Sequence, residues 1–232
     1  ITGQAFHTPA WLADSSVTID GAHTIVEPPK IVIDDSELSR RYQGVVLSRD
    51  ETVGDTSKLT LMQTMLSRSG IRPISPIVDV TNYLMLLSGQ PLHAFDYDKL
   101  RQVAGSDNTM YVRSARVDET LALLDGRTIT LDPSDIVIAA GQTAVALAGA
   151  MGGIETEIDS DTTHVFLESA TFNLYNLRST QMRHGVFSEA ITRVTKGQPA
   201  GLTAPVLVEA AKLLNDYAGL QTSSSIVEAY PG

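Results

Sequence analysis

Residues 72–100 place two prolines, a short apolar run and a Gly-Gln-Pro turn within one stretch, and this order limits how the neighbouring chain can fold. Pro73 and Pro76 favour extended backbone, so we expect no helix to begin at either of them. A Thr-Asn pair follows, then an apolar piece of helical length, and then the turn that leads to His93. The sequence therefore predicts two clusters of small polar groups that flank one apolar element and line a single pocket.

The rest of the chain predicts strands in clusters with helices set apart from them. Apolar or alternating runs indicate short strands, and apolar residues at helical spacing indicate helices that end at glycines. We expect strands at residues 16–19, 31–33, 44–47, 110–115, 119–124, 128–131, 136–139, 144–147, 163–168 and 223–230, and helices at 56–69, 173–184 and 201–218. This order favours an α+β fold, with mixed and antiparallel sheets packed in layers and peripheral helices, over a doubly wound fold.

The length of 232 residues suits one module with a substantial core. We expect residues 1–70 to form a strand-rich part that ends in the first helix, and residues 71–232 to carry the pocket. No apolar run is long enough for a membrane span. The chain begins at Ile1 without a Met, a basic segment or an apolar leader, so we expect a cytoplasmic piece of a longer protein.

Composition excludes several kinds of site. The chain has no cysteine, which rules out disulfides, thiolate zinc sites and a cysteine nucleophile. Its 27 acidic and 17 basic residues give a formal charge of −10. Tight binding of a polyphosphate needs clustered Lys and Arg, so other domains would have to deliver an RNA substrate to this chain.

Three further patterns predict little chemistry. The glycine-rich residues 149–153 match neither common nucleotide-binding motif, and they indicate a tight turn where a ligand could approach backbone N–H groups. The acidic residues 155–161 lack the central glycine and the distal glutamate of an EF-hand loop, which indicates a solvated loop. No serine lies in a nucleophile elbow and no histidines have metal-ligand spacing, so we expect neither a covalent serine hydrolase nor a metal site.

Two residues are candidates for chemistry from their local context. His93 follows the Gly-Gln-Pro turn, although a single histidine is more often structural than catalytic. Glu168 ends an apolar strand, where a carboxylate that points into water is the commoner case. The residues alone leave both interpretations open at each position.

Residues 78–83 (V-D-V-T-N-Y) and 89–96 (G-Q-P-L-H-A-F-D) resemble the editing region of the β chain of bacterial phenylalanyl-tRNA synthetase. The likeness includes polar positions that packing alone would not require. It covers residues 71–197 in three parts, around His93, residues 149–168 and residues 178–197. Residues 191–197 depart from the family's usual R-F-E-R-G pattern.

The resemblance implies a pocket that recognises an amino acid. In the family, the glutamate of an L-E-S-A pattern, here Glu168, accepts a hydrogen bond from the phenol hydroxyl of a misattached tyrosine. The glycine that matches Gly149 contributes a backbone N–H. The threonine and alanine of a T-E-A pattern match Ser188 and Ala190. Serine in place of threonine keeps the hydroxyl and removes a methyl group, which is expected to loosen that wall.

The implied reaction is hydrolysis of the ester between tyrosine and the terminal ribose of tRNA(Phe). Because this ester is already activated, a positioned water suffices. We expect His93 to orient or deprotonate the water or to bind the terminal adenosine, and Thr81 and Asn82 to hold the ester end. The implied partners are the 3′ end of tRNA(Phe), tyrosine or phenylalanine-like amino acids and the synthetase α chain, with neither DNA nor a membrane. No cofactor is expected in this chain, since ATP and Mg²⁺ would act elsewhere in the parent enzyme.

Two other functions stay open. The chain could be a non-catalytic structural or tRNA-positioning module of the same synthetase, with the pocket retained but inactive. It could also be a free-standing homologue that binds amino acids or clears mischarged tRNA in trans.

Overall fold

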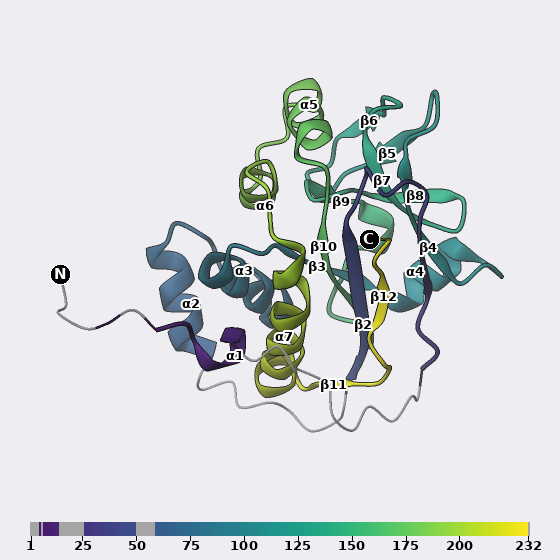
Figure 1. The fold of residues 1–232 in the computed structure, drawn as a ribbon. Helices are drawn as coiled ribbons and strands as arrows, with labels where there is room; N and C mark the ends of the chain where they lie inside the picture. Colours follow the sequence, from purple (N-terminus) through teal and green to yellow (C-terminus); the bar gives the residue numbers. More distant parts are fainter. Residues whose placement is uncertain (1–4, 6, 14–25, 50–58, 232) are drawn as a thin grey trace.

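The computed structural model describes residues 5, 7–13, 26–49 and 59–231 (Figure 1). Along the chain the elements are α1 (Ala10–Ala13), β1 (Lys30–Ile33), β2 (Arg41–Arg49), α2 (Leu59–Arg68), α3 (Pro76–Ser88), β3 (Leu92–Asp96), α4 (Tyr97–Ala104), β4 (Thr109–Ser114), β5 (Thr120–Ala122), β6 (Thr128–Thr130), β7 (Ile136–Ala140), β8 (Thr143–Leu147), β9 (Met151–Gly152), η1 (Ile154–Thr156), β10 (His164–Thr171), α5 (Leu174–His184), α6 (Glu189–Val194), η2 (Ala200–Leu202), α7 (Thr203–Ala218), β11 (Leu220–Thr222) and β12 (Val227–Ala229).

Two main sheets make up the body of the described chain. One has the strand order β1-β4-β7-β8-β9, in which β1 and β4 are parallel and the other pairs are antiparallel. The other has the order β11-β2-β10-β3, with β12 also paired to β2, and all of its pairs are antiparallel. Strands β5 and β6 form a separate hairpin. The prediction of an α+β fold with mixed and antiparallel sheets is confirmed.

Three apolar cores separate the layers. The core between the two main sheets contains Phe95 and Ile138. A second core, with Leu167 and Leu207, lies between the β2-β10-β3 sheet and the helices α2, α3 and α7, which Figure 1 shows together on one side of that sheet. The third core, with Leu147, lies between the outer face of the other sheet and β5, β6, α5 and α6. No helix in the described ranges is both long enough and apolar enough to cross a lipid bilayer.

Strand β10 is central to this arrangement because both of its faces are buried. Side chains alternate between the two faces of a strand. Val165 and Leu167 therefore pack against the helices, whereas Phe166 and Ala170 pack between the two sheets. Glu168 has the same parity as Phe166 and Ala170, so its carboxylate enters the interior between the sheets.

The prediction that no helix begins at the prolines is wrong. Helix α3 begins at Pro76, and the Ser75 hydroxyl accepts a hydrogen bond from the Val78 N–H at the cap. Proline suits the first position of a helix because its missing N–H would have no intrahelical acceptor there. As a result Thr81 and Asn82 lie within the helix and do not precede it.

Most other predicted elements are present, with shifted ends. Strands β1, β2, β4 to β8 and β10 correspond to predicted strands, and α2, α5 and α7 correspond to the three predicted helices. The predicted strand at 223–230 is reduced to β12, and residues 16–19 and 56–58 lie outside the described residues. Strand β3 and helices α4 and α6 were not predicted, since each is short.

Candidate active site

The register of three neighbouring strands sets the centre of the site. Glu168 of β10 lies directly opposite His93 of β3 on one side and Gly44 of β2 on the other. Residues directly opposite each other on antiparallel strands point to the same face. Glu168 and His93 therefore both point into the space between the two sheets.

A small cavity of about 60 Å³ occupies this space. Glu168 and His93 line it from one sheet, and Ile138 and Ala146 line it from the other. Gly149 contributes the turn between β8 and β9. The rest of the lining is largely apolar, so a polar group on a ligand has few partners here, and Glu168 is the main one.

Glu168 is buried and has only one protein hydrogen-bond donor among the described residues. The Tyr42 hydroxyl donates to its Oε2 atom at 2.7 Å. Removal from water raises the pKa of Glu168 to about 7, because the Tyr42 hydrogen bond offsets the loss of hydration only in part. Its Oε1 atom receives no hydrogen bond from any described residue and is available to a ligand.

His93 is partly buried, and neither ring nitrogen bonds to a described residue. Removal from water lowers the pKa of His93 to about 4, so the imidazole is neutral near pH 7. Its ring packs edge-on against Phe95, with the centroids 4.3 Å apart. A Cβ atom at Gly152 would lie 2.6 Å from the imidazole Cε1 atom, so only glycine leaves room for the ring in this position.

A wider groove of about 1100 Å³ adjoins the small cavity. The groove and the cavity share His93, Ala190 and the turn at residues 150–152 in their walls. Thr81 and Asn82 line the groove from α3. The structure therefore brings together the two polar clusters of residues 72–100, one on a helix and one on a strand.

The polar groups of Thr81 and Asn82 differ in availability. The Thr81 hydroxyl donates to the Val78 carbonyl oxygen at 2.8 Å within α3, and it retains the capacity to accept a bond. The Asn82 side-chain amide makes no hydrogen bond to any described residue. Asn82 is therefore the freer of the two to contact a ligand in the groove.

Ser188 lines the groove, and Gly149 lines the small cavity. The Ser188 hydroxyl donates to the Ala150 carbonyl oxygen at 2.7 Å and accepts from the Ile191 N–H at 3.2 Å as the N-cap of α6. Ser188 thus fixes α6, and with it Ala190, against the glycine-rich turn. Within the described chain the Gly149 N–H has no acceptor, and Gly149 has a φ of 62°, which favours glycine.

The groove has an acidic wall. Its charged lining residues are Arg49, Asp125, Glu157, Asp159 and Glu189. Four of these five are acidic, so the groove disfavours phosphate groups.

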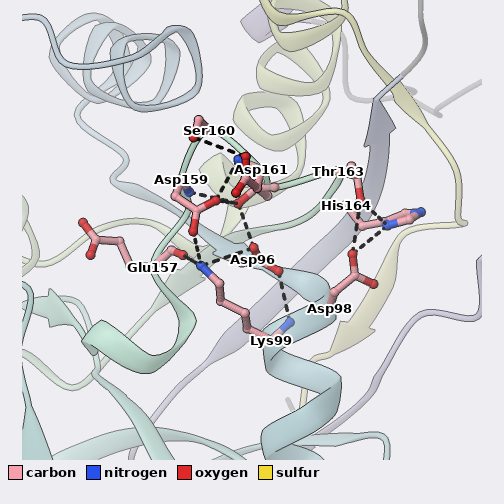
Figure 2. A network of polar contacts seen from close by, with 10 residues as sticks. Asp96, Asp98, Lys99, Glu157, Asp159, Ser160, Asp161, Thr163 and His164 are labelled. Atoms are coloured by element: carbon pink, nitrogen blue, oxygen red, sulfur yellow. Dashed lines mark hydrogen bonds and ion pairs between the residues drawn. The ribbon is translucent and has the colours of Figure 1, made fainter.

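Part of this wall is fixed from behind by a polar network (Figure 2). The Lys99 ammonium of α4 bonds to the Asp159 carboxylate at 2.6 Å and to the Glu157 carbonyl oxygen at 2.7 Å. The Thr162 hydroxyl donates to the buried Asp96 carboxylate at 2.7 Å. The pKa of Lys99 is raised, mainly by its hydrogen bond to Asp159. Lys99 therefore positions the loop and is not free to neutralise a ligand.

Two residues of the site were not predicted, namely Tyr42 and Gly152. Tyr42 is far from Glu168 in sequence, and strand periodicity marks it only as a core residue. Gly152 belongs to the glycine-rich turn, but its missing side chain makes room for an imidazole of the same chain and not for a ligand. In the described part of the chain, no group of three or more His, Asp or Glu side chains could hold a metal ion.

The profile of the B3/4 domain matches residues 38–219, which include every element around the cavity. The chain belongs to the B3/4 domain family. Both walls of the site, from Tyr42 to Ala190, lie within the matched part of this B3/4 domain.

Curated relatives are phenylalanine–tRNA ligase β subunits. The protein from Geobacillus kaustophilus is 44% identical over 168 residues, which cover 72% of this chain and 20% of that protein. The protein from Carboxydothermus hydrogenoformans is 39% identical over 220 residues, which cover 95% of this chain and 26% of that protein. The B3/4 domain described here thus spans about a fifth to a quarter of the length of these relatives.

A solved structure is also similar. It is an N-terminal fragment of the phenylalanyl-tRNA synthetase β subunit from Pyrococcus horikoshii, with a TM-score of 0.44 and 13% sequence identity. The likeness covers 71% of this chain and 50% of that one. The resemblance to the synthetase β chain that the motifs indicated is confirmed by the family match and the curated relatives.

Proposed function

We propose that this B3/4 domain is an editing module of a phenylalanine–tRNA ligase β chain, and that it hydrolyses tyrosine from tRNA(Phe). The observation that carries the proposal is the strand register that puts Glu168 beside His93 in the wall of one cavity. The names of the curated relatives support the parent enzyme. The α chain of that ligase is then the expected partner, and ligation chemistry with ATP and Mg²⁺ belongs to other parts of it.

Recognition depends on one hydroxyl group. A pocket built for phenylalanine rejects tyrosine only about a hundredfold, because an added hydroxyl is tolerated. A pocket built for tyrosine discriminates better, since phenylalanine leaves the free Glu168 Oε1 atom and the Gly149 N–H without partners. Rejection on the order of 10⁴-fold is then attainable.

Hydrolysis requires a water molecule held near the ester. A base whose conjugate acid has a pKa of about 4 removes a proton poorly at neutral pH. The neutral His93 imidazole is therefore better suited to orient the water, or to bond with the terminal ribose, than to deprotonate. Asn82, whose side-chain amide bonds to no described residue, would hold the ester end from the adjoining groove, and the Thr81 hydroxyl would accept a further bond.

The phosphates of the tRNA backbone would have to be bound by other domains of the ligase. The acidic groove wall and the net charge of −10 repel phosphates, whereas the groove can accept a terminal nucleoside and an amino acid. Delivery of the 3′ end by other domains of the ligase follows from this charge distribution.

The test is deacylation of tyrosyl-tRNA(Phe), measured with this chain and with a full-length synthetase that carries the same residues. Glu168→Ala should abolish deacylation while far-ultraviolet circular dichroism stays unchanged, and Glu155→Ala, an exposed carboxylate outside the cavity, is the matched control. Unchanged hydrolysis by Glu168→Ala would remove Glu168 from the mechanism.

His93→Ala should slow turnover more than it weakens tyrosine binding, because His93 acts on the water and Glu168 acts on the phenol. A variant with normal turnover and poor affinity would reverse that assignment. Binding of tRNA without hydrolysis, by the chain and by the synthetase, would favour a tRNA-positioning module. Deacylation by this chain but not by the synthetase would favour a free-standing protein that acts in trans.

A further inference from the structure

The carboxylate of Glu168 is already bound to a phenol of its own chain. Tyr42 lies on β2 two residues from Gly44, so its side chain shares the face from which Glu168 projects. The phenol is completely buried in the core between the sheets, and it donates to Glu168 Oε2 at 2.7 Å. Tyr42 is not among the residues that line the cavity, so it reaches Glu168 from behind.

The contact with Tyr42 leaves the two carboxylate oxygens of Glu168 in different environments. Oε2 is occupied by Tyr42, and Oε1 receives no bond from a described residue. A carboxylate that is bonded on one side loses rotational freedom, and its free oxygen is aimed in advance at a ligand. Preorganisation of this kind lowers the cost of forming the second bond.

We propose that Tyr42 is a specificity-determining positioning residue, which holds Glu168 so that its second oxygen accepts the phenol of a tyrosine. The inference rests on the proposed function, because it assumes that the cavity takes a tyrosine side chain. Glu168 contacts the substrate in this arrangement, and Tyr42 acts through Glu168 alone.

Tyr42 also affects the ionisation of Glu168. Among the residues that the structure describes, the titratable groups that face Glu168 are Tyr42 from β2 and His93 from β3, and no charged side chain lines the cavity from the opposite sheet. A phenol donor stabilises the carboxylate form, whereas burial favours the protonated form. Loss of the Tyr42 hydroxyl would therefore raise the pKa of Glu168 above its value of about 7 and leave less carboxylate at neutral pH to accept a substrate phenol.

A second buried tyrosine provides a matched control. Tyr97 belongs to the same core and is also fully buried. Its hydroxyl donates to the Glu27 carbonyl oxygen at 2.5 Å and does not contact Glu168. Tyr42→Phe and Tyr97→Phe each remove one buried hydroxyl from this core, but only the first should alter recognition of tyrosine.

The experiment measures binding of free tyrosine and free phenylalanine to this chain by calorimetry, and the KM and kcat of tyrosyl-tRNA(Phe) deacylation, from pH 6 to pH 9. Tyr42→Phe should lower the ratio of tyrosine to phenylalanine affinity about tenfold at pH 7, because Glu168 is then no longer held in place and less of it is ionised. The loss should appear in KM, with kcat within about twofold of wild type. The loss of tyrosine preference in Tyr42→Phe should become smaller towards pH 9, where Glu168 is ionised in this variant too.

A second substitution keeps the inference testable if Tyr42→Phe does not fold. Fluorotyrosine incorporated at position 42 keeps the shape and the hydroxyl and makes the phenol a stronger donor. It should shift the pH midpoint of tyrosine binding downward, opposite to the shift in Tyr42→Phe. A purely structural contact would not move this midpoint in opposite directions.

The outcomes separate the inference from the function on which it rests. A wild-type chain without preference for tyrosine would overturn both. A wild-type preference that Tyr42→Phe retains, with the same pH midpoint, would overturn the inference alone. Equal losses of preference in Tyr42→Phe and Tyr97→Phe would show a role in packing only and would also overturn it.

Discussion

Two buried carboxylates in this chain have opposite environments. Asp135, immediately before β7, and Glu168, in β10, are 0% and 6% exposed. Asp135 accepts four hydrogen bonds, from the Thr180 hydroxyl, the Arg183 guanidinium, the His184 imidazole and the Asp132 N–H. Burial is the largest influence on its pKa and raises it, but these bonds, led by that from Thr180, together hold the pKa below its usual value.

Glu168 has one donor where Asp135 has four, and its pKa is raised to about 7. The difference shows how the same chemical group serves two purposes. A carboxylate with all of its acceptor sites filled ties elements together, in this case α5 to β7. A carboxylate left short of donors in a dry cavity costs stability but can bind a ligand that supplies the missing donor.

The largest expected effect contrasts the two carboxylates directly. Asp135→Asn should lower the free energy of unfolding by about 3–5 kcal/mol, because it leaves the Arg183 guanidinium without its buried counter-charge and disrupts the bonds from Thr180 and His184. Glu168→Gln should cost little at pH 8, since it removes a charge that the cavity solvates poorly. Urea denaturation measures both, and equal losses would contradict the contrast.

Glu168 should also make the stability of the fold depend on pH. The folded-state pKa of Glu168, about 7, is above its unfolded value near 4.5, so the folded chain binds an extra proton between these values. Its contribution to stability is therefore full below pH 4.5 and declines by about 3 kcal/mol as the pH rises to 7.

The measurement is the difference in unfolding free energy between wild type and Glu168→Gln from pH 5 to 8. His93 has a folded-state pKa lowered to about 4, and on its own it destabilises the fold as the pH falls from 6.5 to 4. This contribution cancels in the difference because both proteins keep His93. A difference that does not change with pH would show that the carboxyl is not desolvated.

Gly152→Ala tests whether the space around His93 is as restricted as the geometry indicates. The new methyl would lie 2.6 Å from the ring, so we expect a loss of about 1–3 kcal/mol and loss of deacylation as the imidazole moves. Gly201→Ala is the control, since its added Cβ meets no atom within 4 Å. Retained activity in Gly152→Ala would show that His93 does not need its present position.

The smallest effect is expected at Ser188. Ser188→Ala removes a helix cap and the bond to Ala150, at a cost of about 1 kcal/mol. Ser188→Thr keeps the hydroxyl and should keep both bonds. Thermal unfolding of the two variants measures how much the cap contributes to stability. A larger loss of stability in Ser188→Thr than in Ser188→Ala would mean that the wall has no room for a methyl group.

The residues of the site were predictable to different degrees. His93 and Glu168 have local contexts and a family resemblance that mark them, and the structure places both in one cavity. Tyr42 has neither, because its role comes from a hydrogen bond across 126 positions of sequence. Helix α3 was misjudged at Pro76 because the same residue can exclude a helix or begin one, and the Ser75 cap decides which.

The class of the fold, the periodicity of its long elements and the family could all be predicted from the amino-acid sequence. These properties depend on local patterns of residues, each of which lies within a single helix, strand or motif. The hydrogen bond from Tyr42 to one oxygen of Glu168, and the room that Gly152 leaves for His93, became visible only in the folded chain. Such contacts depend on strand register and on the distance between sheets, which arise from packing among residues far apart in the chain.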